Sequence, residues 1–176
     1  MVKVKMSATI SNKFKRIKLL LLDFDGVMTD GFVYVDENGK ESVRCSRRDG
    51  MGIKMMKSAG IEVGVISKEI NPVVTARCHK LGIACFQRIS DGKGKRRIIE
   101  TLAKEKSLSL DQIAFIGDDV QDIEGLSIIG LPIAVSDAHP KIFPYVKYIT
   151  KRKGGDHAVR EVTDLILESQ GVKLTY

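Results

Sequence analysis

Residues 17–27 read IKLLLLDFDGV, an apolar run that ends in two aspartates one residue apart. A short apolar run bounded by turn residues predicts a buried β-strand. Two carboxylates at the tip of one strand can divide the roles of nucleophile and proton donor, so Asp23 and Asp25 are candidate catalytic residues. Together with the Gly-Asp-Asp sequence at residues 117–119, this pattern indicates magnesium-dependent phosphoryl chemistry.

The same strand pattern recurs along the chain. Runs rich in leucine or β-branched residues alternate with helix-sized segments, and this alternation predicts a parallel sheet. We therefore expect an α/β fold with a Rossmann-like, doubly wound parallel sheet. The expected strands are residues 17–22, 61–67, 83–86, 113–117 and 131–135.

Capping residues indicate where the helices begin and end. Asp49 can cap a helix that ends at Gly60, and Asn71, which is followed by proline, can start a helix that ends at Gly82. The amphipathic pattern of residues 158–168 predicts a last helix.

One segment departs from this alternation. Between residues 31 and 46, two stretches of alternating pattern flank Asn38-Gly39, which is a strong hairpin signal. We expect a protruding β-hairpin here, with a role of its own.

Length and charge limit the possible classes. The 176 residues, 43% of them hydrophobic, suit one domain, which we assign to residues 17–176. Residues 1–16 are basic and are expected to form a flexible tail. The net charge of +7 favours anionic partners. No zinc-finger spacing or RNA-binding motif accompanies this charge, so a nucleic-acid partner is not expected.

The cysteines and the apolar runs bear on location. Cys45, Cys78 and Cys85 lack metal-site spacing and indicate free thiols in a reducing compartment. The sequence shows neither a signal-peptide pattern nor an apolar run long enough to span a membrane. We therefore expect a soluble, cytoplasmic protein with no membrane partner.

Polar residues follow several of the expected strands. In a parallel α/β sheet the loops that leave the carboxyl ends of the strands meet in one crevice. Carboxylates gathered there repel each other unless a cation joins them, and an oxygen-rich site favours Mg²⁺. Asp118 and Asp119 alone are equally compatible with an ordinary Asp-rich turn. The residues expected in the crevice are Asp23, Asp25, Ser67, Asp118, Asp119 and Asp122.

The order of these motifs resembles that of the haloacid dehalogenase-like phosphohydrolases. The resemblance implies that Asp23 becomes an aspartyl-phosphate, while Asp25 protonates the leaving alcohol and then activates water. It also implies that the carboxylates of Asp23 and Asp118 and the backbone carbonyl of Asp25 hold Mg²⁺. Asp25 itself argues for phosphoryl transfer, because the dehalogenases of this superfamily lack that acid.

The other motif residues have supporting roles under this resemblance. Ser67 is expected to donate its hydroxyl to a phosphate oxygen, and Asp119 and Asp122 to orient the metal ligands. The lysine motif is ambiguous, because Lys93 and Lys95 both lie where one lysine is usual. Apolar residues follow Lys95 at helical spacings of three, four and seven, so Lys95 is the first choice and Lys93 the reserve.

The motif spacing leaves no room for a cap domain. A capless site is open unless a neighbouring subunit covers it, and the hairpin is the element expected to pair with copies of itself. Within the superfamily the chain resembles the capless 3-deoxy-D-manno-octulosonate 8-phosphate phosphatases, which implies a homotetramer. The stretches that carry this resemblance are residues 25–31, 48–53, 117–119, 137–140, 154–155 and 158–161.

The resemblance implies a small anionic substrate, the phosphate ester of a 2-keto-3-deoxy sugar acid. Arg48, Arg77 and Arg160 are candidates for binding its carboxylate or phosphate. Glu69, however, stands where the octulosonate phosphatases typically have arginine. Glu69, Arg77 and Lys80 instead match residues of phosphatases that act on nonulosonate 9-phosphates. The octulosonate ester is therefore the first candidate and a nonulosonate 9-phosphate the alternative.

Two other classes remain as alternatives. A phospho-accepting receiver domain also combines an acidic cluster, a lysine and a parallel sheet, but it would carry its phosphorylated aspartate after a later strand. A non-catalytic oligomerisation module could retain the fold without turnover.

Overall fold

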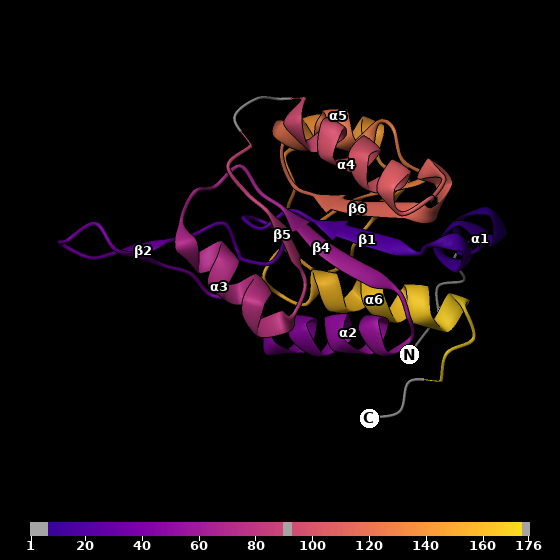
Figure 1. Cartoon of the computed structure of the whole chain (residues 1–176), viewed down its shortest axis with the longest axis horizontal. Coiled ribbons are helices and arrows are strands. Elements are labelled where there is room, and N and C mark those ends of the chain that lie inside the picture. The colour runs from indigo at the N-terminus through magenta and orange to yellow at the C-terminus, as the bar shows by residue number, and fades with distance from the viewer. Residues whose placement is uncertain (1–6, 90–92, 174–176) are drawn as a thin grey trace.

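A parallel sheet forms the centre of the molecule. The computed structural model describes residues 7–89 and 93–173 (Figure 1). The six strands lie in the order β5-β4-β1-β6-β7-β8, and every pair is parallel. The strands are β1 (Leu19–Leu22), β4 (Glu62–Ile66), β5 (Ala84–Phe86), β6 (Ile113–Gly117), β7 (Leu131–Ala134) and β8 (Tyr148–Ile149). All five expected strands are confirmed, most of them with narrower bounds, and only the two-residue β8 was not expected.

Helices cover both faces of this sheet. Figure 1 shows α4 and α5 on one face and α2 and α6 on the other, so the doubly wound arrangement is confirmed. The helices are α1 (Ala8–Arg16), α2 (Arg47–Ser58), α3 (Pro72–Leu81), α4 (Gly94–Glu105), α5 (Ile123–Leu126) and α6 (Ala158–Ser169), and the 3₁₀ turns are η1 (Leu110–Gln112), η2 (Val120–Asp122) and η3 (Pro140–Tyr145). Among the helices in the described ranges, none combines the length and the apolar character that crossing a bilayer requires.

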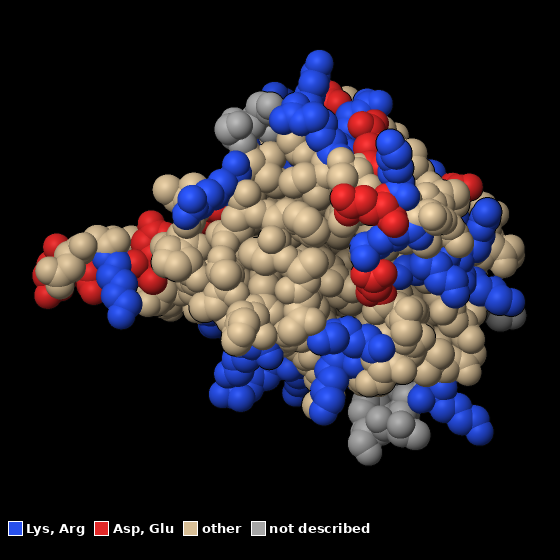
Figure 2. All heavy atoms as spheres, in the orientation of Figure 1, with Lys and Arg blue, Asp and Glu red and all other residues tan. Residues whose placement is uncertain are grey.

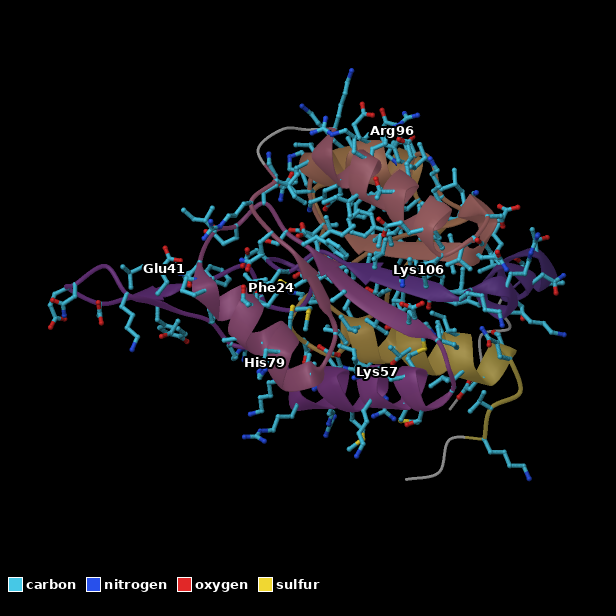
Figure 3. All side chains as sticks on the ribbon, viewed as in Figure 1. Phe24, Glu41, Lys57, His79, Arg96 and Lys106 are labelled. Carbon is cyan, nitrogen blue, oxygen red and sulfur yellow. The ribbon has the colours of Figure 1, made fainter. Side chains whose placement is uncertain are left out.

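Burial on both faces explains the composition of the central strands. All four residues of β1 and all five of β6 are buried, as expected for parallel strands covered on two sides. Phe24, which directly follows the first aspartate, lies inside the core, whereas Arg96 projects outward from α4 (Figure 3). The core thus anchors the strand tip that carries the first motif.

The caps of α3 follow the sequence signals, but that of α2 does not. The side chain of Asn71 accepts from Val73 N, and Gly82 adopts a left-handed conformation with φ of 61°. The cap of α2 is Ser46, whose Oγ accepts from the backbone of the second and third helical residues. The expected Asp49 cap is therefore wrong, because this carboxylate is buried and accepts from Arg160 N at 2.8 Å. Asp49 thus joins α2 to the start of α6.

The expected hairpin is confirmed between β2 (Tyr34–Val35) and β3 (Glu41–Ser42). It protrudes from the body of the molecule (Figure 1). Asp36 closes its turn, since its Oδ1 accepts from Asn38 N at 3.0 Å and Lys40 N at 2.8 Å. The regular pairing is short, and most of the hairpin is exposed to solvent.

The expected flexible tail is wrong for residues 8–16, which form α1; residues 1–6 lie outside the described residues. Phe14 is fully buried on this helix and meets the ring of Tyr148 edge to face at a centroid distance of 5.3 Å. The side chain of Gln170 also donates to Ile17 O at 2.8 Å. The basic composition obscured the pattern of an amphipathic nine-residue helix, whose single aromatic residue packs on the core.

Replacing this anchor is expected to destabilise the whole domain. Phe14→Ala should lower the free energy of unfolding by about 3–5 kcal/mol, because it leaves a cavity and removes an aromatic pair. Lys15→Ala on the exposed side of α1 should change it by less than about 0.5 kcal/mol. Urea unfolding followed by circular dichroism measures both. Equal stability of the two variants would mean that α1 does not support the fold.

Candidate active site

The central strands place the motif residues at one edge of the sheet. Asp23 continues β1, since its backbone N donates to Ile116 O at 2.9 Å. Ser67 continues β4 in the same way, donating to Phe86 O at 2.8 Å. Asp118 directly follows β6. Because β1 lies between β4 and β6, the three residues converge as expected for a parallel sheet.

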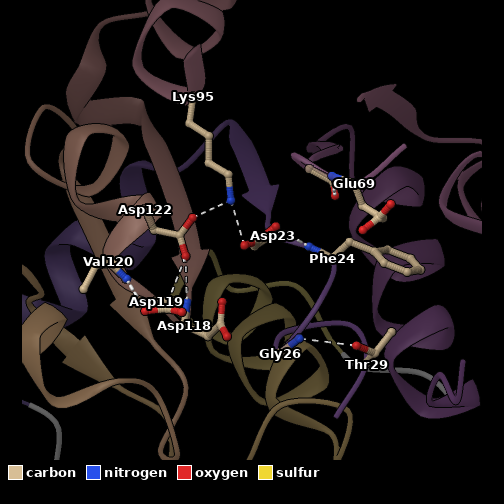
Figure 4. Close-up of polar contacts among 11 residues, drawn as sticks. Asp23, Phe24, Gly26, Thr29, Glu69, Lys95, Asp118, Asp119, Val120 and Asp122 are labelled. Atoms are coloured by element: carbon tan, nitrogen blue, oxygen red, sulfur yellow. Dashed lines mark hydrogen bonds and ion pairs between the residues drawn. The ribbon is translucent and has the colours of Figure 1, made fainter. Parts of the chain in front are cut away.

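Three carboxylates meet at this edge (Figure 4). One oxygen each from Asp23, Asp118 and Asp122 lies within 4.8 Å of the other two. Asp23 and Asp122 are buried, and Asp118 is half-buried. Such proximity is repulsive unless positive charge balances it.

A buried lysine supplies part of that charge. Lys95, which is 1% exposed, places Nζ 2.7 Å from Asp23 Oδ2 and 2.5 Å from Asp122 Oδ1. Burial alone would lower the pKa of Lys95, but the charges of Asp23 and Asp122 raise it overall, so the ammonium is maintained. Lys93 is exposed at the start of α4. The geometry therefore favours Lys95 over the reserve candidate.

Asp122 organises the loop after β6. Its Oδ2 accepts from Asp118 N at 2.9 Å and from Asp119 N at 3.2 Å, while Oδ1 meets Lys95. The side chain of Asp119 faces its own loop, where Oδ1 accepts from Val120 N at 2.6 Å. Both oxygens of Asp122 are therefore engaged by the protein and tie the loop after β6 to Lys95.

Two carboxylate oxygens remain available for a cation. Among residues 7–89 and 93–173, Asp118 Oδ1 is buried without a hydrogen-bond partner, and Asp23 Oδ2 has only the ion-pair contact with Lys95, without hydrogen-bond geometry. Burial, followed by repulsion from neighbouring carboxylates, raises the pKa of Asp23 to about 7 and that of Asp118 to about 8. A hard divalent cation with oxygen ligands, such as Mg²⁺, fits this donor set.

A glycine makes room for the Asp118 carboxylate. Gly26 has φ of 75°, and a Cβ at this position would lie 2.0 Å from Asp118 Oδ2. The loop that contains it is closed by Phe24 O, which accepts from the backbone N of residues 27, 28 and 29. A Cβ on Gly154 would in turn lie 1.8 Å from Gly26 O. Neither glycine was expected to have this steric role, although both lie in the stretches that carry the family resemblance.

Asp25 and Ser67 flank the carboxylate cluster. Asp25 is half-buried, and burial followed by the charge of Glu69 raises its pKa, which favours the protonated form that a general acid needs. Ser67 is 1% exposed, and its Oγ accepts from Glu69 N at 3.0 Å. The hydrogen bond to Ser67 and the charge effect on Asp25 together place Glu69 near this edge of the sheet.

The other substrate-binding candidates are dispersed. Arg77 donates to Ser46 O at 2.9 Å, and its buried Nε finds no hydrogen-bond partner in the described part of the chain. Lys80 is exposed in the last turn of α3. Arg48 and Arg160 line a separate cavity at the starts of α2 and α6, and Arg160 pairs with Asp164 at 2.7 Å. These contacts of Arg77 and Arg160 thus lie with Ser46 and Asp164 and not with the three clustered carboxylates.

Comparisons with known proteins agree with this geometry. Residues 62–162 match the haloacid dehalogenase-like hydrolase family. The 3-deoxy-D-manno-octulosonate 8-phosphate phosphatase KdsC of Escherichia coli is 38% identical over 167 residues, which cover 94% of this chain and 87% of that protein. The crystal structure of the Yersinia pestis phosphatase of the same name superposes with a TM-score of 0.90 at 36% identity, covering 95% of this chain and 89% of the other.

A third relative has been solved with ligands bound. The phosphatase from Moraxella catarrhalis, in complex with magnesium, phosphate and a KDO molecule, superposes with a TM-score of 0.88 at 31% identity, covering 94% of each chain. The chain therefore belongs to the haloacid dehalogenase-like hydrolases, in the family of the 3-deoxy-D-manno-octulosonate 8-phosphate phosphatases. This membership runs against the receiver-domain alternative.

Magnesium is expected to stabilise the protein, and more strongly at higher pH. The native pKa values of Asp23 and Asp118 lie above their ordinary value of 3.8. The metal-free native state thus binds more protons than the unfolded chain, and its stability falls as pH rises from about 4 to about 8. The cation competes with these protons, so Mg²⁺ should raise the melting temperature more at about pH 8 than at about pH 6.

A matched pair of glycine variants tests whether the carboxylate cluster is responsible. Gly26→Ala should abolish the Mg²⁺-dependent rise in melting temperature, because its Cβ displaces the Asp118 carboxylate. Gly60→Ala carries the same backbone cost, since φ is also 75°, but its Cβ meets nothing within 4 Å. That variant should keep the full rise. A rise that persists in Gly26→Ala would place the metal elsewhere.

Proposed function

We propose that this protein is a magnesium-dependent phosphatase that hydrolyses the phosphomonoester of a 2-keto-3-deoxy sugar acid, with 3-deoxy-D-manno-octulosonate 8-phosphate as the first candidate. The observation that carries the proposal is the tip of β1, where Asp23 lies beside Lys95 and within reach of Asp118. The names of the relatives support the same substrate class.

Covalent catalysis divides the reaction into two displacements. In the first, a carboxylate oxygen of Asp23 bonds to phosphorus while the ester bond to the sugar oxygen breaks, and Asp25 gives its proton to that oxygen. In the second, Asp25 takes a proton from water, the water oxygen bonds to phosphorus, and the Asp23 carboxylate is released with inorganic phosphate. The raised pKa of Asp25 suits the proton donor of the first step.

The charges around Asp23 suit its role as nucleophile. Lys95 favours the ionised carboxylate against the effect of burial, and Ser67 supplies a hydroxyl for a phosphate oxygen. The carboxylates of Asp23 and Asp118 and the backbone carbonyl of Asp25 would hold Mg²⁺, which supplies charge neutralisation between phosphate and nucleophile when bound.

A nonulosonate 9-phosphate remains the second candidate substrate, and Glu69 is the observation that favours it. After burial, the charge of this carboxylate is the next cause that raises the pKa of Asp25, and the backbone N of Glu69 donates to Ser67 Oγ at 3.0 Å. A carboxylate accepts hydrogen bonds from sugar hydroxyls and repels a substrate carboxylate, so it alters the preference among sugar acids.

Loss of the nucleophile is expected to abolish turnover. Asp23→Asn should lower phosphate release from the octulosonate 8-phosphate by on the order of 10³-fold or more, because the amide cannot form the acyl-phosphate. Asp111→Asn, which removes one negative charge in the exposed turn η1, should keep the wild-type rate. The same assay with a nonulosonate 9-phosphate ranks the two substrates. Wild-type turnover by Asp23→Asn would reject the assignment of the nucleophile.

We further propose that the hairpin joins copies of this chain into a homotetramer. Four consecutive apolar residues at its base are exposed: Phe32 by 75%, Val33 by 47%, Tyr34 by 71% and Val35 by 60%. Figure 2 shows the hairpin projecting from the body with acidic side chains towards its tip. A continuous exposed apolar strand is typical of an interface.

Removing these apolar side chains is expected to dissociate the assembly. The double variant Phe32→Ser and Tyr34→Ser should shift the mass measured by light scattering to that of a monomer, with an unchanged circular dichroism spectrum. Met51→Ser, which removes a 50% exposed apolar side chain from α2, should leave the mass unchanged. A wild-type monomer at every concentration would contradict the proposal.

We also propose that the protein is cytoplasmic and binds neither nucleic acid nor a membrane. The thiols of Cys45, Cys78 and Cys85 are free, which suits a reducing cytoplasm. On the face shown in Figure 2, Lys and Arg side chains are spread over several elements and interspersed with Asp and Glu. This distribution does not suggest a nucleic-acid groove.

A further inference from the structure

The loop between β4 and α3 holds Glu69 through its own backbone. Glu69 N donates to Ser67 Oγ at 3.0 Å, and Glu69 Oε1 accepts from Ile70 N at 2.7 Å and Asn71 N at 3.1 Å. These bonds fold the loop onto itself. Of these bonds, only the one to Ser67, which continues β4, ties the loop to the sheet.

The end of β5 supplies the external support. Gln87 directly follows this strand, and its Nε2 donates to Glu69 O at 3.2 Å and to Asn71 O at 3.1 Å. Its Oε1 accepts from Thr75 Oγ1 in the first turn of α3. Arg88, which has φ of 61°, adds a backbone donor to Glu69 O at 3.4 Å. Donors from one short segment thus converge on the loop.

The opposite side of the loop is tied to the hairpin. Asn71 Nδ2 donates to Glu41 Oε2 at 2.7 Å, and Glu41 lies beside α3 at the base of the hairpin (Figure 3). The side chain of Ile70 is 69% exposed. The loop is therefore held from both sides while its outer surface stays open to a substrate.

The chemistry at Gln87 requires a primary amide. The two carbonyls that face Nε2 can only accept hydrogen bonds, and the threonine hydroxyl that faces Oε1 can donate one. A carboxylate of the same shape has no hydrogen to donate, and its negative charge would repel the two carbonyl oxygens. The contacts therefore determine both the orientation of the amide and the residue type.

We propose that Gln87 is a positioning residue that holds residues 69–71 of this loop and thereby determines how Glu69 meets the sugar part of the substrate. Gln87 acts through Glu69 and takes no part in bond breaking. This inference rests on the proposed function, because it assigns Glu69 to recognition of a sugar acid.

Hydrogen exchange tests the positioning directly. Gln87→Glu is isosteric and should speed exchange of the Ile70 and Asn71 amides, with no change in β1. Gln112→Glu makes the same substitution in η1, where the side chain serves as an acceptor for Ser109, and should leave those amides unchanged. Thr75→Val removes only the hydrogen bond from Thr75 Oγ1 to Gln87 Oε1 and should increase the exchange rate of these amides less. Unchanged exchange in Gln87→Glu would overturn the inference whatever the substrate is.

Kinetics tests the link to recognition. Gln87→Glu should raise KM for the sugar acid phosphate by on the order of 10-fold with kcat changed less than about 3-fold, whereas hydrolysis of p-nitrophenyl phosphate should match that of Gln112→Glu. Equal loss on both substrates would indicate general damage to the site and overturn the inference. A wild-type enzyme that hydrolyses only p-nitrophenyl phosphate would instead refute the sugar-acid function, while the exchange result would still decide whether Gln87 holds the loop.

Discussion

The clustered carboxylates of the site depend on the ion pairs of one buried ammonium, that of Lys95. Lys95 lies between Asp23 and Asp122, both nearly inaccessible to water. Without this charge, the three clustered carboxylates would take up protons or separate, because burial and mutual repulsion both oppose ionisation. The lysine offsets only part of the repulsion. The residual negative charge is what makes the site suitable for a divalent cation.

Rigid backbone on each side maintains this arrangement. The Asp122 carboxylate accepts from two consecutive backbone amides of the loop after β6, while the turn after β1 closes on Phe24 O. Glycine lets the two loops approach closely, since a side chain at Gly26 would occupy the space of Asp118. Gly154 packs behind the same turn. The catalytic geometry thus depends on a missing Cβ as much as on the charged groups.

Sequence patterns predicted the sheet well and the periphery less well. The strands that carry Asp23, Ser67 and Asp118 were expected, because buried parallel strands leave strong apolar runs. The two-residue β8 was missed because so short a strand has no pattern of its own. Residues 8–16 were taken for a flexible tail because their basic residues were the stronger signal and Phe14 is the one aromatic residue that anchors them. Asp49 was taken for a cap, although a nearby hydroxyl, that of Ser46, performs that function.

By itself, the sequence determined the class of fold, the acidic strand tips and the order of the motifs, because each of these is encoded in residues close together along the chain. Only the tertiary structure buried Lys95 between Asp23 and Asp122 while leaving Lys93 exposed, placed Arg48 and Arg160 along one cavity, and brought Gln87 to the loop of Glu69. Those outcomes depend on distances through space between separate elements. Packing of the helices on the sheet sets such distances, and no local pattern records them.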